Sequence, residues 1–337
     1  MDQTITSQIY RIMTLRKIPI NHQSEGSKYV DMHHYICGND VPIFDVDNVH
    51  AFNQIVGFMK FLNRENYNVY SRGECELYPT LLPSLMRRKN NNAKTSSSSS
   101  KPNYSTLTYS NPHRMSAKVS KLIDNVKNDN RLKKSLKLDG KHDDEKIEGL
   151  LQHYGISTRY IDAVDNHWIA LWMGLNKFKK FGPAKSYGHY ERREIPLVES
   201  ATGIMITDKD LYLYVILLAV PKQLNLSLDG ITISKDFVET DLRKALPSTF
   251  LRPHAQHGIV LRKIPHTLNS GADYDMATQV VCILRVRIDR ANSWIGDGGL
   301  LCQDALFPSP AHDSGYHILL SRDDIFKEKD FSITKYY

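Results

Sequence analysis

The sequence predicts an α+β fold with a mixed or antiparallel central sheet, flanking helices and a helix-rich N-terminal half. Segments with apolar residues at helical spacing concentrate in the first half of the chain. Apolar runs rich in valine, isoleucine and tyrosine concentrate in the second half. Segregation of this kind favours α+β over an alternating βαβ winding. With 337 residues, 41% hydrophobic and 24% charged, the chain can form one large domain or two ordinary ones.

Two amphipathic helical regions are predicted first. Between Asp47 and Asn63 apolar residues recur every three or four positions, which predicts a helix with Asp47 or Asn48 as its N-cap. Residues 117–138 show the same spacing among many lysines. We expect one basic helix there, or two helices separated near residues 128–130. The helical segment would pack on the domain and keep its basic face in solvent.

The remaining elements of the first half follow from their local patterns. Residues 66–73 predict a turn and a short strand that ends in glycine. Residues 89–109 hold a run of three asparagines and a run of five serines, so we expect a mobile loop or insertion. Residues 148–154 predict the last turns of a helix that ends at Gly155. Residues 166–175 are apolar on most sides, which predicts a buried helix.

Strands are predicted in the second half. Residues 211–220 form a continuous apolar run, typical of a central strand, and residues 280–288 form a second strand. Residues 204–206 and 259–261 are shorter strand candidates. The run at 211–220 is too short to cross a membrane as a helix, which needs about 20 residues. No membrane partner is therefore expected.

Charge and cysteine content narrow the classes of partner and compartment. The net charge of +7, with a pI near 9.0, favours a polyanionic partner such as nucleic acid, or a phosphate-rich ligand such as a dinucleotide. The alternative is a basic surface that only keeps the protein soluble. Four scattered cysteines, without a C-x-x-C pair, predict neither disulfides nor a zinc site, and no metal is expected. The N-terminus lacks the pattern of a signal peptide, so we expect a cytoplasmic protein.

Residues 70–74 (YSRGE) are the first candidate for chemistry. Arg72 can present its planar guanidinium to a phosphate or carboxylate, and Gly73 lets a ligand approach the backbone closely. The alternative is an ordinary surface turn.

Residues 150–162 (LLQHYGISTRYID) are the second candidate. His153 can titrate near neutral pH, and Thr158 offers a hydroxyl group. Arg159 adds a second cation, and Asp162 a carboxylate that can pair with either arginine. The alternative is a structural arginine–aspartate pair with a capping histidine.

Taken together, these segments resemble the FRG domain in order and spacing. The family's F-R-G tripeptide matches at Arg72-Gly73, and its L-L-Q-H-x-G-x-P-T-R-x-x-D motif matches at residues 150–162. Residues 252–258 are similar to its R-x-x-x-Q-x-G segment, and residues 305–308 to its closing L-F-P. Ser71 and Ser157 depart from the usual aromatic residue and proline.

The resemblance implies a domain organisation and a family of activities. It places an N-terminal extension at residues 1–43, the domain at residues 44–320 with an insertion at about 89–146, and a tail at residues 321–337. FRG domains occur in bacterial and phage-related proteins, often beside toxin or defence modules. Their pattern is similar to that of NAD-dependent ADP-ribosyltransferases, which implies an ADP-ribosyltransferase-like fold.

The resemblance also implies roles for particular residues. Arg72 would grip the NAD pyrophosphate or the nicotinamide ribose, and His153 would belong to the nicotinamide pocket. Gln256 would lie in the matching late segment, and Glu199 is the preferred catalytic carboxylate, with Glu74 and Glu239 as the other acidic candidates. The predicted NAD-binding residues are Tyr70, Arg72, Gly73, His153, Tyr154, Gly155, Thr158, Arg159 and Asp162.

Three functions therefore remain open. The first is an NAD-dependent ADP-ribosyltransferase, a toxin or defence effector that modifies RNA or DNA and has a neutralising antitoxin partner. The second is a module that binds a nucleotide or nucleic acid without chemistry. The third is a protein-interaction module whose arginines and aspartates are structural. A solvent-reachable cleft that holds Arg72, His153 and Gln256 together would favour the first two.

Overall fold

A computed structural model of the chain describes residues 15–22, 24–87, 110–182, 187–196, 206–222, 229–267, 269–322, 324–326 and 333–336. Its strands are β1 (Ser27–His34), β2 (Asp40–Val46), β3 (Tyr67–Glu74), β4 (Ile161–Val164), β5 (Asn176–Phe181), β6 (Tyr187–Arg192), β7 (Tyr212–Pro221), β8 (Ile231–Ile233), β9 (Phe237–Asp241), β10 (Gly258–Lys263), β11 (Val280–Arg287) and β12 (Lys335–Tyr336). Its α-helices are α2 (Val49–Asn63), α3 (Pro112–Asn128), α4 (Asn130–Leu136), α5 (Asp143–His153), α6 (His167–Leu175), α7 (Asp208–Leu211), α8 (Leu242–Ala245), α9 (Leu251–Ala255), α10 (Ile288–Ile295), α11 (Gln303–Leu306) and α12 (Ser314–Ser321).

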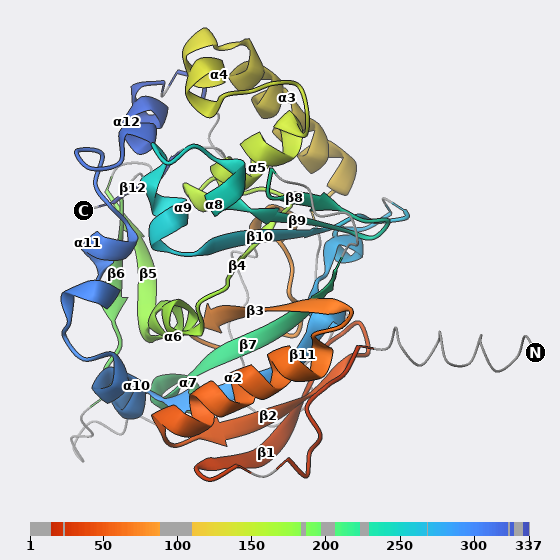
Figure 1. The fold of residues 1–337 in the computed structure, drawn as a ribbon, viewed down its shortest axis with the longest axis vertical. Helices are drawn as coiled ribbons and strands as arrows, with labels where there is room; N and C mark the ends of the chain where they lie inside the picture. Colours follow the sequence, from red (N-terminus) through yellow and green to blue (C-terminus); the bar gives the residue numbers. More distant parts are fainter. Residues whose placement is uncertain are drawn as a thin grey trace, which may run out of the picture.

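A nine-stranded mixed sheet runs through the molecule in the order β1-β2-β11-β7-β3-β4-β10-β9-β8 (Figure 1). The pair β2–β11 is parallel, and the other neighbouring strands of this sheet are antiparallel. Strands β12, β6 and β5 form a second, smaller sheet. The predicted α+β class with a mixed central sheet is therefore confirmed.

The helix predictions near residues 47–63 and 117–138 are confirmed. Helix α2 starts after Asn48, whose side chain accepts a hydrogen bond from the Ala51 amide (2.8 Å), and it buries an apolar face against the sheet. The basic segment forms two helices, α3 and α4. Asp129 separates them, because it ends α3 and caps α4 by accepting from the Leu132 amide (2.8 Å).

Strands are not confined to the second half, since β1, β2 and β3 all precede residue 75. The expected boundary at residue 43 falls inside β2, and β1 and β2 are integral to the large sheet. Strand β1 lies at a sheet edge and has no fully buried residue, so it lacks the apolar alternation that marks a strand. Residues 89–109, and Ile204 and Met205 of a predicted strand, lie outside the described residues.

The large sheet is almost unpaired in its middle, between β3 and β4, and this division makes room for the candidate site. Strand β3 pairs with β7 along its full length, from Tyr67–Pro221 to Glu74–Tyr214. In the described residues it pairs with β4 only through Ser71 and Val164. The halves β1-β2-β11-β7-β3 and β4-β10-β9-β8 therefore diverge on either side of that pair.

Helix α6 packs closely on β3 near the division. A Cβ atom on Gly73 would lie 1.8 Å from the Ala170 carbonyl oxygen, so a side chain at this position would collide with the helix backbone. Glycine at position 73 therefore brings α6 onto the end of β3, next to Arg72. In the part of the chain that the structure describes, no helix is long and apolar enough to cross a membrane.

Candidate functional site

A cavity of about 520 Å³ lies where β3 and β4 diverge. It is bounded by the ends of these strands, the C-terminal end of α5, helix α6, and strands β5 and β6. Its polar lining comprises Ser71, Arg72, Glu74, Cys75, Tyr78, Ser84, Gln152, His153, Ser157, Asp162, Asn176, Lys177, Lys180, Tyr190, Gln256 and Tyr336. The volume is in the range of small-molecule sites, about 300–1,000 Å³.

Arg72 is a partly buried cation of this cavity, with its side chain 18% exposed. Its Nε donates to Glu74 Oε1 (2.6 Å), and its Nη1 donates to the backbone carbonyl of Asp162 (2.6 Å). Burial alone would lower the pKa of Arg72, but the carboxylates of Glu74 and Asp162 outweigh it and raise the pKa above its usual value. The guanidinium therefore stays charged and is held rigidly between β3 and β4.

Asp162 presents the more open carboxylate, with a side chain 45% exposed, against 15% for Glu74. Gln152 Nε2 donates to Asp162 Oδ2 (2.6 Å), while the Arg72 guanidinium bonds to the Asp162 backbone and not to its carboxylate. Asp162 Oδ1 lies 3.8 Å from His153 Nδ1. The negative charge of Asp162 is thus oriented by a neutral amide and remains accessible from the cavity.

His153 is almost fully buried beside this carboxylate, with a side chain 4% exposed. Its ring lies over Gly258, where a Cβ atom would come within 2.7 Å of the imidazole Cε1. Its Nε2 is buried and has no hydrogen-bond partner among the described residues. A buried nitrogen without a partner is energetically costly, and this atom lies beside Gly258 of β10, where a Cβ atom would come within 3.1 Å of it.

Aromatic side chains form another wall of the cavity. Tyr190 packs on Phe307 (ring centroids 4.5 Å apart), and Phe307 stacks on Tyr336 (4.9 Å). Phe178 packs on Tyr190 at 5.1 Å. These rings offer flat apolar surface for a nucleobase or a nicotinamide ring in the same cavity as the polar groups.

Arg252 lies buried behind this wall, and none of its side chain is exposed to solvent. The guanidinium carbon is within 4.3–5.5 Å of the ring centroids of Tyr154, Phe307, Tyr316 and Tyr336. These cation–π contacts connect α9 to the C-terminal strand β12 and fix the aromatic wall.

Six of the predicted site residues line the cavity together: Arg72, Gly73, His153, Gly155, Asp162 and Gln256. Gln256 is 3% exposed, and its Nε2 donates to the Leu306 carbonyl (2.7 Å). Its carboxamide is thereby oriented at the cavity wall.

The other predicted NAD-binding residues do not line this cavity. Tyr70 donates to Glu239 (2.5 Å) and lines a separate cavity of about 390 Å³ on the other side of the division between β3 and β4. Tyr154 is buried under Arg252 and donates to Asp313 (2.6 Å).

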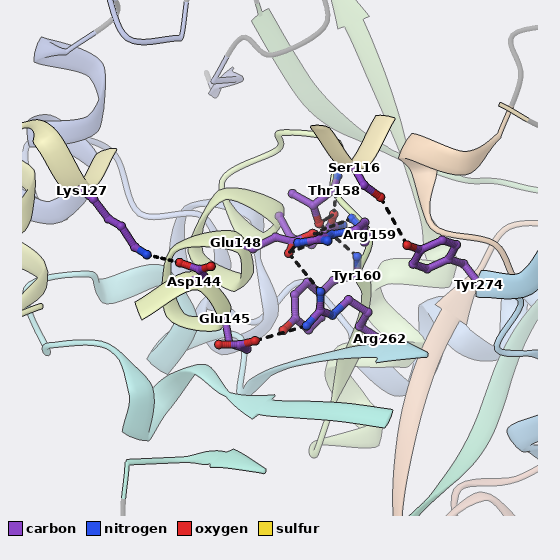
Figure 2. A network of polar contacts seen from close by, with 11 residues as sticks. Ser116, Lys127, Asp144, Glu145, Glu148, Thr158, Arg159, Tyr160, Arg262 and Tyr274 are labelled. Carbon is purple, nitrogen blue, oxygen red and sulfur yellow. Dashed lines mark hydrogen bonds and ion pairs between the residues drawn. The ribbon is translucent and has the colours of Figure 1, made fainter. Parts of the chain in front are cut away.

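Thr158 and Arg159 do not line the cavity but stabilise residues next to it through hydrogen bonds. The Thr158 hydroxyl donates to Gln152 Oε1 (2.8 Å), which fixes the amide that orients Asp162. Arg159 forms hydrogen bonds to both carboxylate oxygens of Glu148 (2.5–3.2 Å). Figure 2 shows Glu148, Thr158 and Arg159 in one polar network, which Arg262 joins at 3.6 Å from Glu148. The network holds the turn between α5 and β4.

The three acidic candidates have different locations. Glu199 lies outside the described residues. Glu239 accepts from Tyr70 and Asn68 in the separate cavity, where burial raises its pKa. Glu74 lines the main cavity but is neutralised by Arg72. Asp162 is therefore the carboxylate best placed for chemistry.

Sequence reasoning missed Gln152 as an orienting residue and missed the aromatic wall. Tyr190 and Tyr336 are far from residues 70–74 and 150–162 in the sequence, so no local motif could connect them to the site.

Comparison of the chain with models of protein families, with characterised proteins and with solved structures finds no match.

Proposed function

We propose that the cavity binds NAD and that the chain is an ADP-ribosyltransferase that releases nicotinamide. The observation that carries this proposal is that Arg72, His153 and Asp162 line one cavity of about 520 Å³ together with an aromatic wall. The aromatic rings suit the nicotinamide, and the Arg72 guanidinium suits a phosphate or ribose oxygen. The division of the central sheet at the cavity supports an ADP-ribosyltransferase-like fold as part of the same proposal.

The chemistry assigned to this site is a substitution at the anomeric carbon of the ribose. The bond between that carbon and the nicotinamide nitrogen breaks, its electron pair leaves with nicotinamide, and positive charge develops on the ribose. The carboxylate of Asp162 stabilises this charge, because an oriented anion in a partly dehydrated site favours a cationic transition state. The acceptor's oxygen or nitrogen then bonds to the ribose carbon, and its proton passes to His153. Water as the acceptor would make the reaction a hydrolysis.

Binding without chemistry is the second candidate, and one observation favours it. Arg72 already contacts Glu74 and the Asp162 backbone, which is typical of an arginine that holds two strands together. In that case the cavity binds a nucleotide through its aromatic wall and is not a catalyst. An interaction module with purely structural arginines is less well supported, because such a module does not require a cavity at this place.

Nicotinamide release by the purified protein tests the proposal. We expect NAD consumption in the presence of RNA, DNA or cell lysate, and a decrease of about 10²–10³-fold for Asp162→Asn, similar to the loss of one transition-state contact elsewhere. Arg72→Ala should lose NAD affinity as well. Glu239→Gln is the matched control, because Glu239 is a partly buried carboxylate on the same sheet that does not line this cavity.

The outcomes separate the two candidates. Turnover that is retained in the Asp162→Asn protein refutes the assigned role of Asp162. Absence of nicotinamide release in every mixture, together with NAD binding that Arg72→Ala abolishes, supports the binding module. Absence of both turnover and binding excludes both functions for this cavity.

A further inference from the structure

The positive charge of the chain is concentrated in one helical hairpin. Residues 112–137, which form α3 and α4, contain eight lysines and arginines and two aspartates, a net charge of +6. The whole chain has a net charge of +7. The remainder is therefore nearly neutral, and the basic balance is a property of this hairpin.

The hairpin turns its cations outward and its apolar residues inward. Val119, Leu122, Ile123 and Val126 of α3 and Leu132 and Leu136 of α4 are buried in one hydrophobic cluster. Arg131, Lys133, Lys134 and Lys137 are exposed. Figure 1 shows α3 and α4 at one end of the molecule, on the opposite side from β1 and β2.

Within the described residues, these four cations have no neutralising partner. In the ranges that the structure describes, none of them has an acidic side chain within ion-pair distance. Asp129, the acidic residue between the two helices, already pairs with Arg322 (2.6 Å). Cations three or four positions apart on a helix lie about 5–6 Å from each other, so the group forms a compact positive surface.

We propose that the exposed face of α3 and α4 binds the phosphate backbone of a nucleic acid. Exposed, unpaired lysines and arginines release counterions from a polyanion, and this release favours binding whatever the base sequence. A membrane surface fits less well, because membrane-bound helices insert an apolar face, and here that face is buried against the protein. The binding is independent of NAD. Its use in docking a nucleic-acid target rests on the proposed transferase function.

The hairpin is connected to the cavity through α5. This helix follows α4 in the chain, packs in the same hydrophobic cluster, and ends at Gln152 and His153, which line the cavity. A strand of nucleic acid held on α3 and α4 is thereby anchored to a packed group of helices whose last residues, Gln152 and His153, line the cavity.

Fluorescence anisotropy with labelled RNA tests the proposal. The probe is a single-stranded RNA of about 20 nucleotides, longer than typical site sizes of about 4–16 nucleotides. The triple variant Arg131→Gln, Lys133→Gln, Lys134→Gln removes three cations from the hairpin. The matched control, Lys28→Gln, Lys235→Gln, Arg290→Gln, removes three exposed cations elsewhere. A DNA strand and a duplex of the same length, and anionic vesicles, complete the panel.

The expected result is quantitative. Each lost phosphate contact lowers the slope of log affinity against log salt by about 0.7, so the triple variant should lose about 2 units of slope. The affinity of the triple variant for RNA should fall about 100-fold at about 0.1 M salt and approach that of the wild type at about 1 M salt. The control should retain the wild-type slope and affinity within about threefold.

Several results would overturn the proposal: no RNA or DNA binding by the wild-type protein at low salt, equal slopes in the two triple variants, or binding to vesicles without binding to any nucleic acid. The RNA, DNA and duplex probes distinguish the sources of the phosphate backbone. Because the assay contains no NAD, its failure would leave the proposed NAD chemistry standing. RNA binding without nicotinamide release would refute that chemistry alone.

Discussion

Replacing Glu148 by glutamine should destabilise the fold without touching the cavity. Glu148 is 1% exposed and accepts hydrogen bonds from the Arg159 backbone amide (3.0 Å) and guanidinium. Removing one partner of a buried ion pair costs about 3–5 kcal/mol, because the other charge stays buried without compensation. Arg262 retains Glu145 at 3.4 Å, so we expect the lower end of this range, about 3 kcal/mol.

The same network predicts how stability depends on pH. Burial alone would raise the pKa of Glu148, but Arg159 and Arg262 outweigh burial and lower the pKa below its ordinary value of 4.5. A carboxyl group whose pKa is lower in the folded state contributes its full stabilisation above the ordinary pKa. This contribution is lost as the pH falls through the folded-state pKa. The wild type should therefore lose more unfolding free energy on acidification below about pH 4.5 than Glu148→Gln does.

Urea denaturation followed by circular dichroism measures both effects. Asp144→Asn is the matched control, since Asp144 lies on the same helix and forms an exposed ion pair with Lys127 (Figure 2). Exposed pairs contribute about 0–1 kcal/mol, so this control should change little. A loss below about 1 kcal/mol for Glu148→Gln, or an unchanged pH dependence, would refute the assignment of this network as a stabilising one.

Three further outcomes follow from the site. Gly73→Ala should reduce the melting temperature strongly, because its Cβ would lie 1.8 Å from the Ala170 carbonyl oxygen; a wild-type melting curve would contradict the close packing of α6 on β3. Gly258→Ala should reduce nicotinamide release strongly and the melting temperature only slightly, because the new Cβ would lie 2.7 Å from the His153 ring and displace it. Unchanged turnover would argue against a role for that ring. Expression of the chain alone should slow cell growth, and Asp162→Asn should restore it; equal growth with both forms would remove the support for a toxin.

The local elements could be predicted because their causes are local. Helix α2 follows from apolar spacing and an asparagine cap, and the break at Asp129 follows from a side chain that caps the next helix. The central strand β7 follows from an unbroken apolar run. Strand β1 could not be found this way, because an edge strand needs no buried face and leaves no periodic pattern.

The candidate site was only partly predictable. The two polar segments around Arg72 and His153 were found, and the structure brings them to one cavity. Within each segment, however, the sequence could not tell a side chain that faces the cavity from one that supports it. Arg159 and Thr158 have the same functional groups as residues that line the cavity, but hydrogen bonds to Glu148 and Gln152 keep them out of its lining.

By itself, the sequence determined the class of the fold, the basic hairpin and the two polar segments, because these depend on composition and on spacing of a few residues. Only the tertiary structure decided where the sheet divides, that Asp162 and not Glu239 faces the cavity, and that Tyr190 and Tyr336 form its wall. These features depend on contacts between residues that are distant in the chain. Such contacts are set by the packing of whole strands and helices, which local spacing does not encode.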